Sequence, residues 1–193
     1  MDQQAVLDEF RSVDALLEGH FKLSSGMHSS VYLQCARVLM NPDRAARLCK
    51  AFTDKLLATG VEIDLVISPA MGGVIVGYEV ARQLGVDGFF VERVDGEFAM
   101  RRGFAIPKGA RILMMEDVVT TGLSSRECIK TINDLGGNVV AAGCLINRSG
   151  GTADVGVPLT ALATIKAPIF DADNIPEDLK DVPAVKPGSR GLK

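Results

Sequence analysis

The sequence predicts an α/β fold in which a mostly parallel sheet is flanked by helices. Short apolar runs alternate along the chain with segments of helical periodicity, which is the order of successive βαβ units. Two turns from a strand into a helix contain glycine, at 69–73 and at 120–124. Between them, the apolar run 112–115 ends in two adjacent acids, Glu116 and Asp117. Ligands of open α/β sheets bind at the carboxyl ends of the strands, so we expect the functional residues at these turns.

The length and composition are those of one globular domain. With 193 residues, of which 47% are hydrophobic and 23% charged, the chain fits a single domain, 1–193, with a substantial core. The net charge of −3 gives no basic field for nucleic acid, and the longest apolar run, 139–146, is too short to cross a membrane. The acidic N-terminus lacks the apolar region of a signal peptide, and the dispersed cysteines form no CxxC pair. We expect a cytoplasmic protein with reduced cysteines and with neither a nucleic-acid nor a membrane partner.

The first forty residues predict a helix followed by a hairpin. Residues 3–18 indicate an amphipathic helix that ends at Gly19. Two short apolar segments, 21–23 and 31–34, then flank a polar turn around Gly26. By itself, this serine-rich turn is compatible with any hairpin tip. The apolar face of the helix is formed by Val6, Phe10, Val13, Leu16 and Leu17.

The next segment predicts a helix, a strand and a glycine-rich turn. Asn41 and Pro42 are a helix start, with an N-cap followed by proline at the first helical position. A core strand over 64–68 leads into the turn 69–73 and a helix that ends at Gly85. The glycine spacing in this turn matches neither GxGxxG nor a Walker sequence. The glycines either let the backbone approach a ligand phosphate or let the turn pack closely on the sheet.

Residues 88–103 predict a strand and then a hairpin or mobile loop with Gly96 at its tip. Arginines flank this loop at Arg93, Arg101 and Arg102. In isolation, they are also what a solvated β-ribbon would carry.

The C-terminal half after the central motif predicts a helix, two strands and an arm. The helix covers 124–135, with Ser124 and Glu127 as a capping box. A buried strand over 139–147 precedes Arg148, and a last strand covers 159–166. From Ala167 onward the prolines indicate an irregular arm, and we expect its final residues, 186–193, to be disordered.

The segment 111–125 contains the most specific signal in the chain. Its buried strand ends in Glu116 and Asp117, and a turn rich in hydroxyls and glycine leads into a helix. Backbone amides and the helix dipole favour a phosphate at such a turn. The two acids cannot bind a phosphate, so they would hold sugar hydroxyls or a divalent cation. Taken alone, the acids are also compatible with a solvated strand end beside an ordinary βα turn.

Residues 112–124 also resemble the motif with which the type I phosphoribosyltransferases bind 5-phosphoribosyl 1-pyrophosphate (PRPP). The resemblance implies the fold of that family, with a small N-terminal hood at about 17–40 that includes the C-terminal arm, and a core at about 41–166. It implies that the two acids hold ribose hydroxyls, that the turn binds the 5′-phosphate, and that Mg²⁺ is held mainly through PRPP, with no protein ligand directly assigned. The PRPP-binding residues that it implies are Glu116, Asp117, Val118, Val119, Thr120, Thr121, Gly122, Leu123, Ser124, Ala70, Met71, Gly72, Gly73 and Arg93.

The hood segment and Arg148 narrow the resemblance to the orotate branch of this family. Residues 21–32 follow the pattern F-x-L-x-S-G-x-x-S-x-x-Y, with which the hood of orotate enzymes begins. An arginine at a strand end is often a surface ion pair, but in that branch it holds the substrate carboxylate, for which its planar fork is suited. One departure is Ser24, where many orotate enzymes have lysine. The orotate-binding residues implied are Thr120, Arg148, Tyr32, Leu33, Ser25 and Gly26.

The resemblance implies transfer of the phosphoribosyl group from PRPP to orotate, giving orotidine 5′-monophosphate and pyrophosphate in pyrimidine synthesis. The implied catalytic residues are Asp117, Glu116 and Arg102, and the implied assembly is a homodimer with shared active sites. The loop of known orotate enzymes is rich in lysine and histidine, whereas this loop has arginines, which leaves its role open. Two other interpretations also stay open: a purine or uracil phosphoribosyltransferase, and a PRPP-sensing regulator without catalysis.

Overall fold

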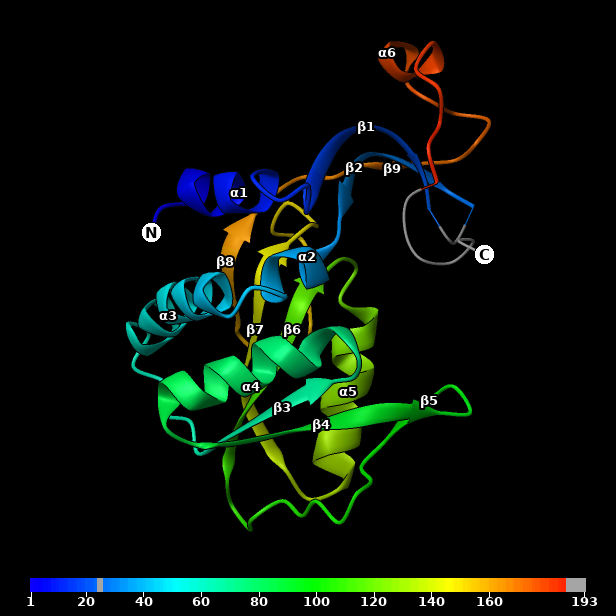
Figure 1. Cartoon of the computed structure of the whole chain (residues 1–193). Helices are drawn as coiled ribbons and strands as arrows, with labels where there is room; N and C mark the ends of the chain where they lie inside the picture. The colour runs from blue at the N-terminus through cyan, green and yellow to red at the C-terminus, as the bar shows by residue number, and fades with distance from the viewer. Residues whose placement is uncertain (24–25, 187–193) are drawn as a thin grey trace.

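The computed structural model describes residues 1–23 and 26–186, which form two sheets with helices around them (Figure 1). The helices are α1 (Gln3–Arg11), α2 (Cys35–Leu39), α3 (Pro42–Leu57), α4 (Gly72–Leu84), α5 (Leu123–Asp134) and α6 (Glu177–Lys180). The strands are β1 (Leu16–Lys22), β2 (His28–Leu33), β3 (Leu65–Pro69), β4 (Asp87–Val94), β5 (Glu97–Ala99), β6 (Arg111–Val119), β7 (Asn138–Asn147), β8 (Leu159–Thr164) and β9 (Ile169–Phe170).

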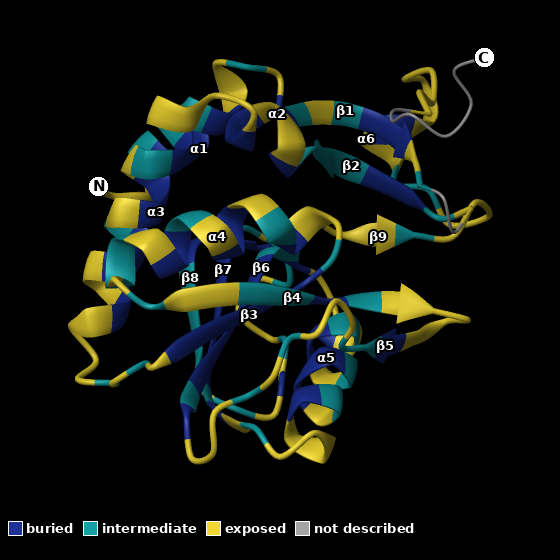
Figure 2. Ribbon diagram, turned by 60° about the horizontal axis from the view of Figure 1, so that its bottom comes forward, coloured by how far each residue is buried: buried dark blue, intermediate teal, exposed yellow. Residues whose placement is uncertain are grey.

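The central sheet has the strand order β5-β4-β3-β6-β7-β8, and its neighbouring strands are parallel except for β4 and β5. Helices α3 and α4 cover one face and α5 covers the other (Figure 2). Because helices lie on both faces, β6 and β7 are buried along most of their length. The predicted α/β class, with a mostly parallel sheet flanked by helices, is confirmed.

The core consists of two apolar clusters, one on each face of the sheet. The first lies beneath α3 and α4, and at its centre the ring of Phe52 packs directly on β7. This contact requires glycine at 143, because a Cβ there would lie 2.3 Å from Phe52 Cζ. Cys49, Cys128 and Cys144 are free and buried, as predicted for core cysteines, and Cys35 is free and buried as well.

Two predicted helix boundaries are confirmed by their caps. The Asn41 side chain accepts a hydrogen bond from the Arg44 amide at 2.9 Å, so it is the N-cap of α3. Helix α4 ends at Gly85, which adopts the left-handed conformation with φ of 70°. Among the described residues, no helix has the length and apolar character needed to cross a membrane.

The predicted helix over 3–18 is wrong in its second half. Helix α1 ends at Arg11, and the chain turns at Asp14, whose φ is 53°. Leu16 then begins β1 and pairs with Leu33 across the hairpin. The apolar residues at 16 and 17 fit the helical spacing of the residues before them, but they also fit the start of a buried strand. Over so few residues, spacing alone does not distinguish a helix from a strand.

The predicted capping box of Ser124 and Glu127 is also wrong. The N-cap of α5 is Gly122, with φ of 77° and no side-chain cap. Glu127 instead forms an ion pair with Arg93 of β4, whose hairpin partner β5 packs against the helix.

The hood is a second sheet, β1-β2-β9, that lies over the carboxyl ends of β6, β7 and β8 (Figure 1). The C-terminal arm, residues 167–186, contributes β9 and α6, so this part of it is less irregular than predicted. Its end runs along β1, where the Lys22 amide donates to the Val185 carbonyl at 2.8 Å. The arm is thus part of the hood, and all but the first residue of the predicted disordered segment 186–193 lies outside the described residues.

Candidate active site

The carboxyl end of β6 meets the N-terminus of α5 in a turn that glycine makes possible. At Gly122 the positive φ favours glycine, and a Cβ would lie only 2.8 Å from the carbonyl oxygen of Asp154. Arg126 on α5 donates to the carbonyls of Thr121 and Asp154, which joins this turn to the loop after β7. Thr120 and Thr121 are exposed. A helix N-terminus with exposed hydroxyls beside it is therefore available to an anion.

Glu116 points from β6 toward α5 and is buried, with 7% of its surface exposed. Its carboxylate accepts a hydrogen bond from the hydroxyl of Ser125. Burial raises the pKa of Glu116, and the hydroxyls of Ser125 and Ser124 oppose that rise by stabilising the ionised form. The side chain is therefore held by the protein in the absence of ligand, and a sugar hydroxyl would share or replace the Ser125 contact.

Asp117 lies on the opposite face of the strand, toward α4 and α2. Its Oδ1 accepts a hydrogen bond from the Val118 amide at 2.9 Å, and the residue remains partly exposed. Burial raises the pKa of Asp117, while the Val118 amide opposes the rise. The two adjacent acids thus flank the end of one strand and do not stand side by side.

The turn 69–73 packs against this strand end, and its glycines are needed for that packing. A Cβ on Gly72 would lie 2.9 Å from Asp117 Oδ1, and one on Gly73 would lie 3.0 Å from the carbonyl oxygen of Met115. Ala70 donates its amide to the Val91 carbonyl, and Met71 projects into solvent. Close packing on the sheet therefore accounts for both glycines and also places the turn beside Asp117.

Arg148 follows β7 at the same edge, and its amide donates to the carbonyl of Val119 at 2.8 Å. Its Nη2 donates to Ser29 Oγ at 2.9 Å and to the Val31 carbonyl at 3.3 Å, so the guanidinium touches the hood. Its Nε is buried and has no hydrogen-bond partner within the described residues. Burial lowers the pKa of Arg148, which nevertheless remains a cation at neutral pH.

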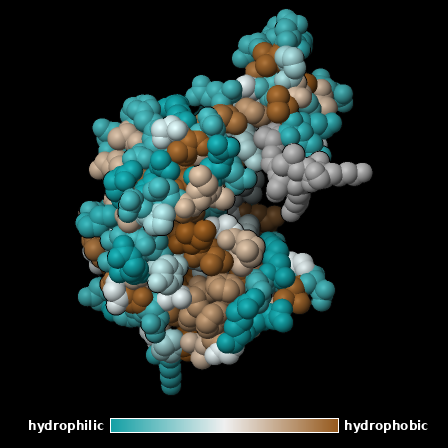
Figure 3. Space-filling view, in the orientation of Figure 1, coloured by the Kyte–Doolittle hydropathy of each residue, from teal (hydrophilic) through white to brown (hydrophobic). Residues whose placement is uncertain are grey.

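A cavity of about 410 Å³ joins Arg148 to the turn after β6. Figure 3 shows the molecule hollowed between the hood, at the upper right, and the core below it. The cavity is lined by Thr120, Thr121, Arg148, Ser149, Thr152, Ala153, Ala167 and Ile169. The structure thus brings together the predicted phosphate turn and the predicted carboxylate-binding arginine.

Of the predicted hood residues, Tyr32, Leu33 and Gly26 do not line this cavity. Tyr32 lies beside the ring of Phe21, at 5.8 Å between centroids, whereas Leu33 points to the other face of β2 and packs on the core. Gly26 lies in the exposed turn of the hairpin, with φ of 88°. Ser25 lies outside the described residues.

The loop arginines are held by acids that the sequence interpretation missed. Arg93 pairs with Glu127 and lies over the ring of Phe98, at 4.1 Å from its centroid. Arg102 and Arg101 approach Glu92 at 3.1 and 3.9 Å. The predicted hairpin could have indicated the pairs with Glu92, because Glu92 lies opposite Ala99, two residues before Arg101.

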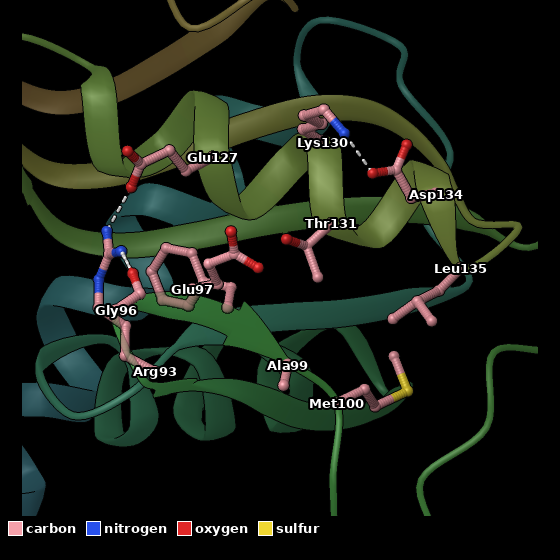
Figure 4. Close-up of a pocket in the computed structure, with 11 residues that line it drawn as sticks. Arg93, Gly96, Glu97, Ala99, Met100, Glu127, Lys130, Thr131, Asp134 and Leu135 are labelled. Carbon is pink, nitrogen blue, oxygen red and sulfur yellow. Dashed lines mark hydrogen bonds and ion pairs between the residues drawn. The ribbon is translucent and has the colours of Figure 1, made fainter.

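A larger cavity of about 560 Å³ lies between this hairpin and α5 (Figure 4). Arg93 is the one predicted PRPP or orotate residue in its lining. Its two basic side chains are already paired, Arg93 with Glu127 and Lys130 with Asp134, which leaves the carboxylate of Glu97 as the remaining charge and does not favour a phosphate. The smaller cavity, which contains the predicted turn and Arg148, is therefore the candidate active site.

Comparison with known proteins gives one family. The model of the phosphoribosyl transferase domain matches residues 38–180. The orotate phosphoribosyltransferase of Caulobacter vibrioides is 55% identical over 193 residues, which is all of both chains. That of Erythrobacter litoralis is 58% identical over 191 residues, covering 98% of this chain and 99% of the relative. Among solved structures, the orotate phosphoribosyltransferase of Aeropyrum pernix is similar, with a TM-score of 0.67 and 26% identity over 83% of this chain and 93% of that one.

Replacing Glu116 with glutamine should change how stability depends on pH. Because the pKa of Glu116 is raised in the folded state, its contribution to stability is present below the unfolded pKa and is lost as the pH rises through the folded pKa. Glu116→Gln removes this loss, so the variant should gain stability relative to the parent between about pH 4 and pH 7.

Urea unfolding at several pH values measures the difference, with Glu97→Gln, at an exposed acid on β5, as the control. A difference between Glu116→Gln and the parent that stays constant over this pH range would contradict the prediction.

Proposed function

The chain belongs to the phosphoribosyl transferase domain family, and from this premise we infer that it is an enzyme that transfers the 5-phosphoribosyl group of PRPP to orotate. The products are orotidine 5′-monophosphate and pyrophosphate, in the synthesis of pyrimidine nucleotides. The main support for this proposal is that the turn after β6 and Arg148 line the same cavity. A ligand there meets a phosphate-binding turn at one end and a cation for a carboxylate at the other.

The phosphate end of the proposed site is the start of α5. The residues proposed to bind the 5′-phosphate are Thr120 to Ser124, with the preceding Val118 and Val119 beside it. The helix N-terminus attracts the anion, and the exposed hydroxyls of Thr120 and Thr121 add hydrogen-bond donors. Arg126 keeps this turn fixed against the loop after β7, so the donors are preorganised.

The ribose is proposed to lie over the end of β6, where Asp117 is the more accessible of the two acids. Displacement at the anomeric carbon passes through a cation-like sugar, which a nearby carboxylate stabilises. Glu116 is proposed to hold a ribose hydroxyl from the other side of the strand. The turn 70–73 lies beside Asp117, where its backbone can approach the leaving pyrophosphate.

The donors at this edge fit a magnesium ion that is bound chiefly through the substrate. Within the described residues, no group of three or more acid, histidine or cysteine side chains could hold a metal, but Asp117 offers a partly exposed carboxylate. Mg²⁺ is commonly bound by one or two carboxylates together with substrate phosphates. When bound with PRPP, the ion supplies positive charge that neutralises the leaving pyrophosphate.

The orotate is proposed to direct its carboxylate to Arg148 and its ring edge to Thr120. The Nη2 of Arg148 is already engaged by the hood, so the substrate contact uses the remaining donors, including the unpartnered Nε. Tyr32 is retained as a candidate wall for the ring. Leu33 is not retained, because it is packed on the core.

The loop arginines are proposed to approach the pyrophosphate when the hairpin closes on the substrates. In the present structure Arg102 pairs with Glu92, so a contact with the leaving group requires this ion pair to break. Exposed ion pairs contribute at most about 1 kcal/mol, which a doubly charged pyrophosphate readily offsets. The same argument applies to Arg93, which pairs with Glu127.

We propose that the enzyme transfers to orotate and to no other base. Loss of orotate absorbance on adding PRPP and Mg²⁺ measures the reaction, with uracil and hypoxanthine tested in parallel. Turnover of uracil or hypoxanthine in place of orotate would support the other transferases, and PRPP binding without any turnover would support a regulator.

Replacing Asp117 with asparagine should lower kcat far more than it lowers stability. The amide keeps the shape but loses the charge opposite the cation-like ribose, so we expect a loss of ~100-fold or more. The melting temperature should change little. Asp134→Asn, at an exposed acid near the end of α5, is the control, and equal turnover of Asp117→Asn and the parent would refute the role.

A homodimer is proposed, and an exposed apolar face on α4 supports it. Met71, Ile75 and Tyr78 follow helical spacing and are 84%, 50% and 68% exposed. Figure 3 shows brown, apolar atoms gathered over this helix. Such a patch is typical of an interface. The face adjoins the turn 69–73, so a second subunit there would approach the active site.

Replacing Tyr78 with aspartate should convert the dimer to a monomer, because a charge would be buried in the interface. Light scattering coupled to size-exclusion chromatography measures the mass. Leu135→Asp, at a half-exposed apolar residue that follows α5, should remain dimeric. A parent chain that is monomeric at micromolar concentration, or a dimeric Tyr78→Asp, would contradict this interface.

A further inference from the structure

Ser29 lies at the contact between the hood, the arm and the candidate active site. It is fully buried in β2, directly beneath the guanidinium of Arg148. Its Oγ is 2.9 Å from Arg148 Nη2 and 3.0 Å from the carbonyl oxygen of Pro168 in the arm. The same oxygen lies 3.2 Å from the Val31 amide and 3.0 Å from the Val31 carbonyl. One hydroxyl therefore connects three segments that are distant in the sequence.

The hydrogen-bonding capacity of this hydroxyl is already used. A serine hydroxyl donates one hydrogen and accepts two. Arg148 Nη2 and the Val31 amide can only donate, so they occupy both acceptor positions. The single hydrogen goes to one of the two carbonyls, Pro168 or Val31. Ser29 thus has nothing left with which to bind a substrate, and its effect must pass through its partners.

The effect on Arg148 is to fix one side of the guanidinium and leave the other side free. Both hydrogens of Nη2 have acceptors, on Ser29 and on Val31. Nε is buried without a partner, and Nη1 makes no hydrogen bond within the described residues. Because the group is planar and rigid, fixing Nη2 determines where Nε and Nη1 point. A ligand carboxylate would supply the oxygen atoms that these donors lack.

We propose that Ser29 is a positioning residue that orients Arg148 toward the substrate carboxylate and links that orientation to docking of the arm through Pro168. This inference rests on the proposed function, since it concerns the carboxylate of orotate. It adds a residue of the hood that does not touch the substrate and yet determines affinity for its charged group. Loss of the hydroxyl frees the guanidinium to adopt other rotamers, so the donors are no longer preorganised.

The first test compares Ser29→Ala with the parent chain in steady-state assays. We expect the KM for orotate to rise about tenfold, as for loss of a hydrogen bond to a charged group, with the KM for PRPP unchanged. Ser29→Thr keeps the hydroxyl and should restore most of the affinity for orotate. Ser29→Cys keeps the buried volume with a much weaker acceptor and should behave as alanine does, independently of any packing defect. Ser30→Ala, on the next residue of β2, is the matched control and should leave both KM values unchanged.

The second test is a double-mutant cycle with Arg148. We expect Arg148→Ala to raise the KM for orotate on the order of 100-fold, with the KM for PRPP nearly unchanged. If Ser29 acts through Arg148, then Ser29→Ala should add little to the KM of Arg148→Ala. The melting temperatures of all variants identify any general loss of structure.

The outcomes separate this inference from the function on which it rests. A parent chain that does not consume orotate overturns the proposed function itself. An active parent with an unchanged orotate KM in both Ser29→Ala and Ser29→Cys overturns the positioning role alone. A tenfold effect that persists in the Arg148→Ala background also overturns it, because Ser29 would then act by another route.

Discussion

The parallel hydrogen bonding of β6 between β3 and β7 is the constraint on which the site depends. In this register Ile67 of β3 pairs with Met114, and Val119 pairs with Asn147 of β7. The three strands therefore end at one edge, with their turns next to one another. A shift of one residue in β6 would exchange the faces of Glu116 and Asp117 and would move Arg148 away from the turn. The long ladder with β7 and the burial of both faces of β6 make such a shift costly.

Most charged side chains at this edge already have hydrogen-bond or ion-pair partners within the protein. Glu116 is stabilised by Ser125, Arg148 by the hood, and the loop arginines by Glu92 and Glu127. Buried charges without such partners would destabilise the fold by several kcal/mol. Substrate binding is therefore an exchange of partners, in which affinity is the difference between new and old contacts. The Nε of Arg148 is an exception, since it is buried without a hydrogen-bond partner within the described residues, and a ligand that reached it would replace no hydrogen bond.

The sequence predicted most elements of the core and the turn that carries Thr120 and Thr121 into the candidate site, because these depend on local patterns. The cap at Asn41 has one physical interpretation, and the structure confirms it. The glycines of the turn 69–73 had two, phosphate binding or close packing, and only the structure shows how closely they pack. The extent of α1 could not be predicted, because Leu16 and Leu17 satisfy both periodicities. Nor could the contacts between distant segments: Ser29 with Arg148, Arg93 with Glu127, or β9 with β2. These depend on tertiary packing. The separation of Tyr32 from Leu33, by contrast, follows from the alternation of side chains along a strand and could have been predicted.

The contact between Gly72 and Asp117 also has a consequence at the level of genetic variation. Every missense change of a single nucleotide in a glycine codon introduces a side chain with a Cβ atom. At position 72 that atom would lie within 3.0 Å of both oxygens of the Asp117 carboxylate. No such allele can leave the acid where it is. A missense allele at this codon therefore acts on the position of the acid without changing the codon for the acid itself.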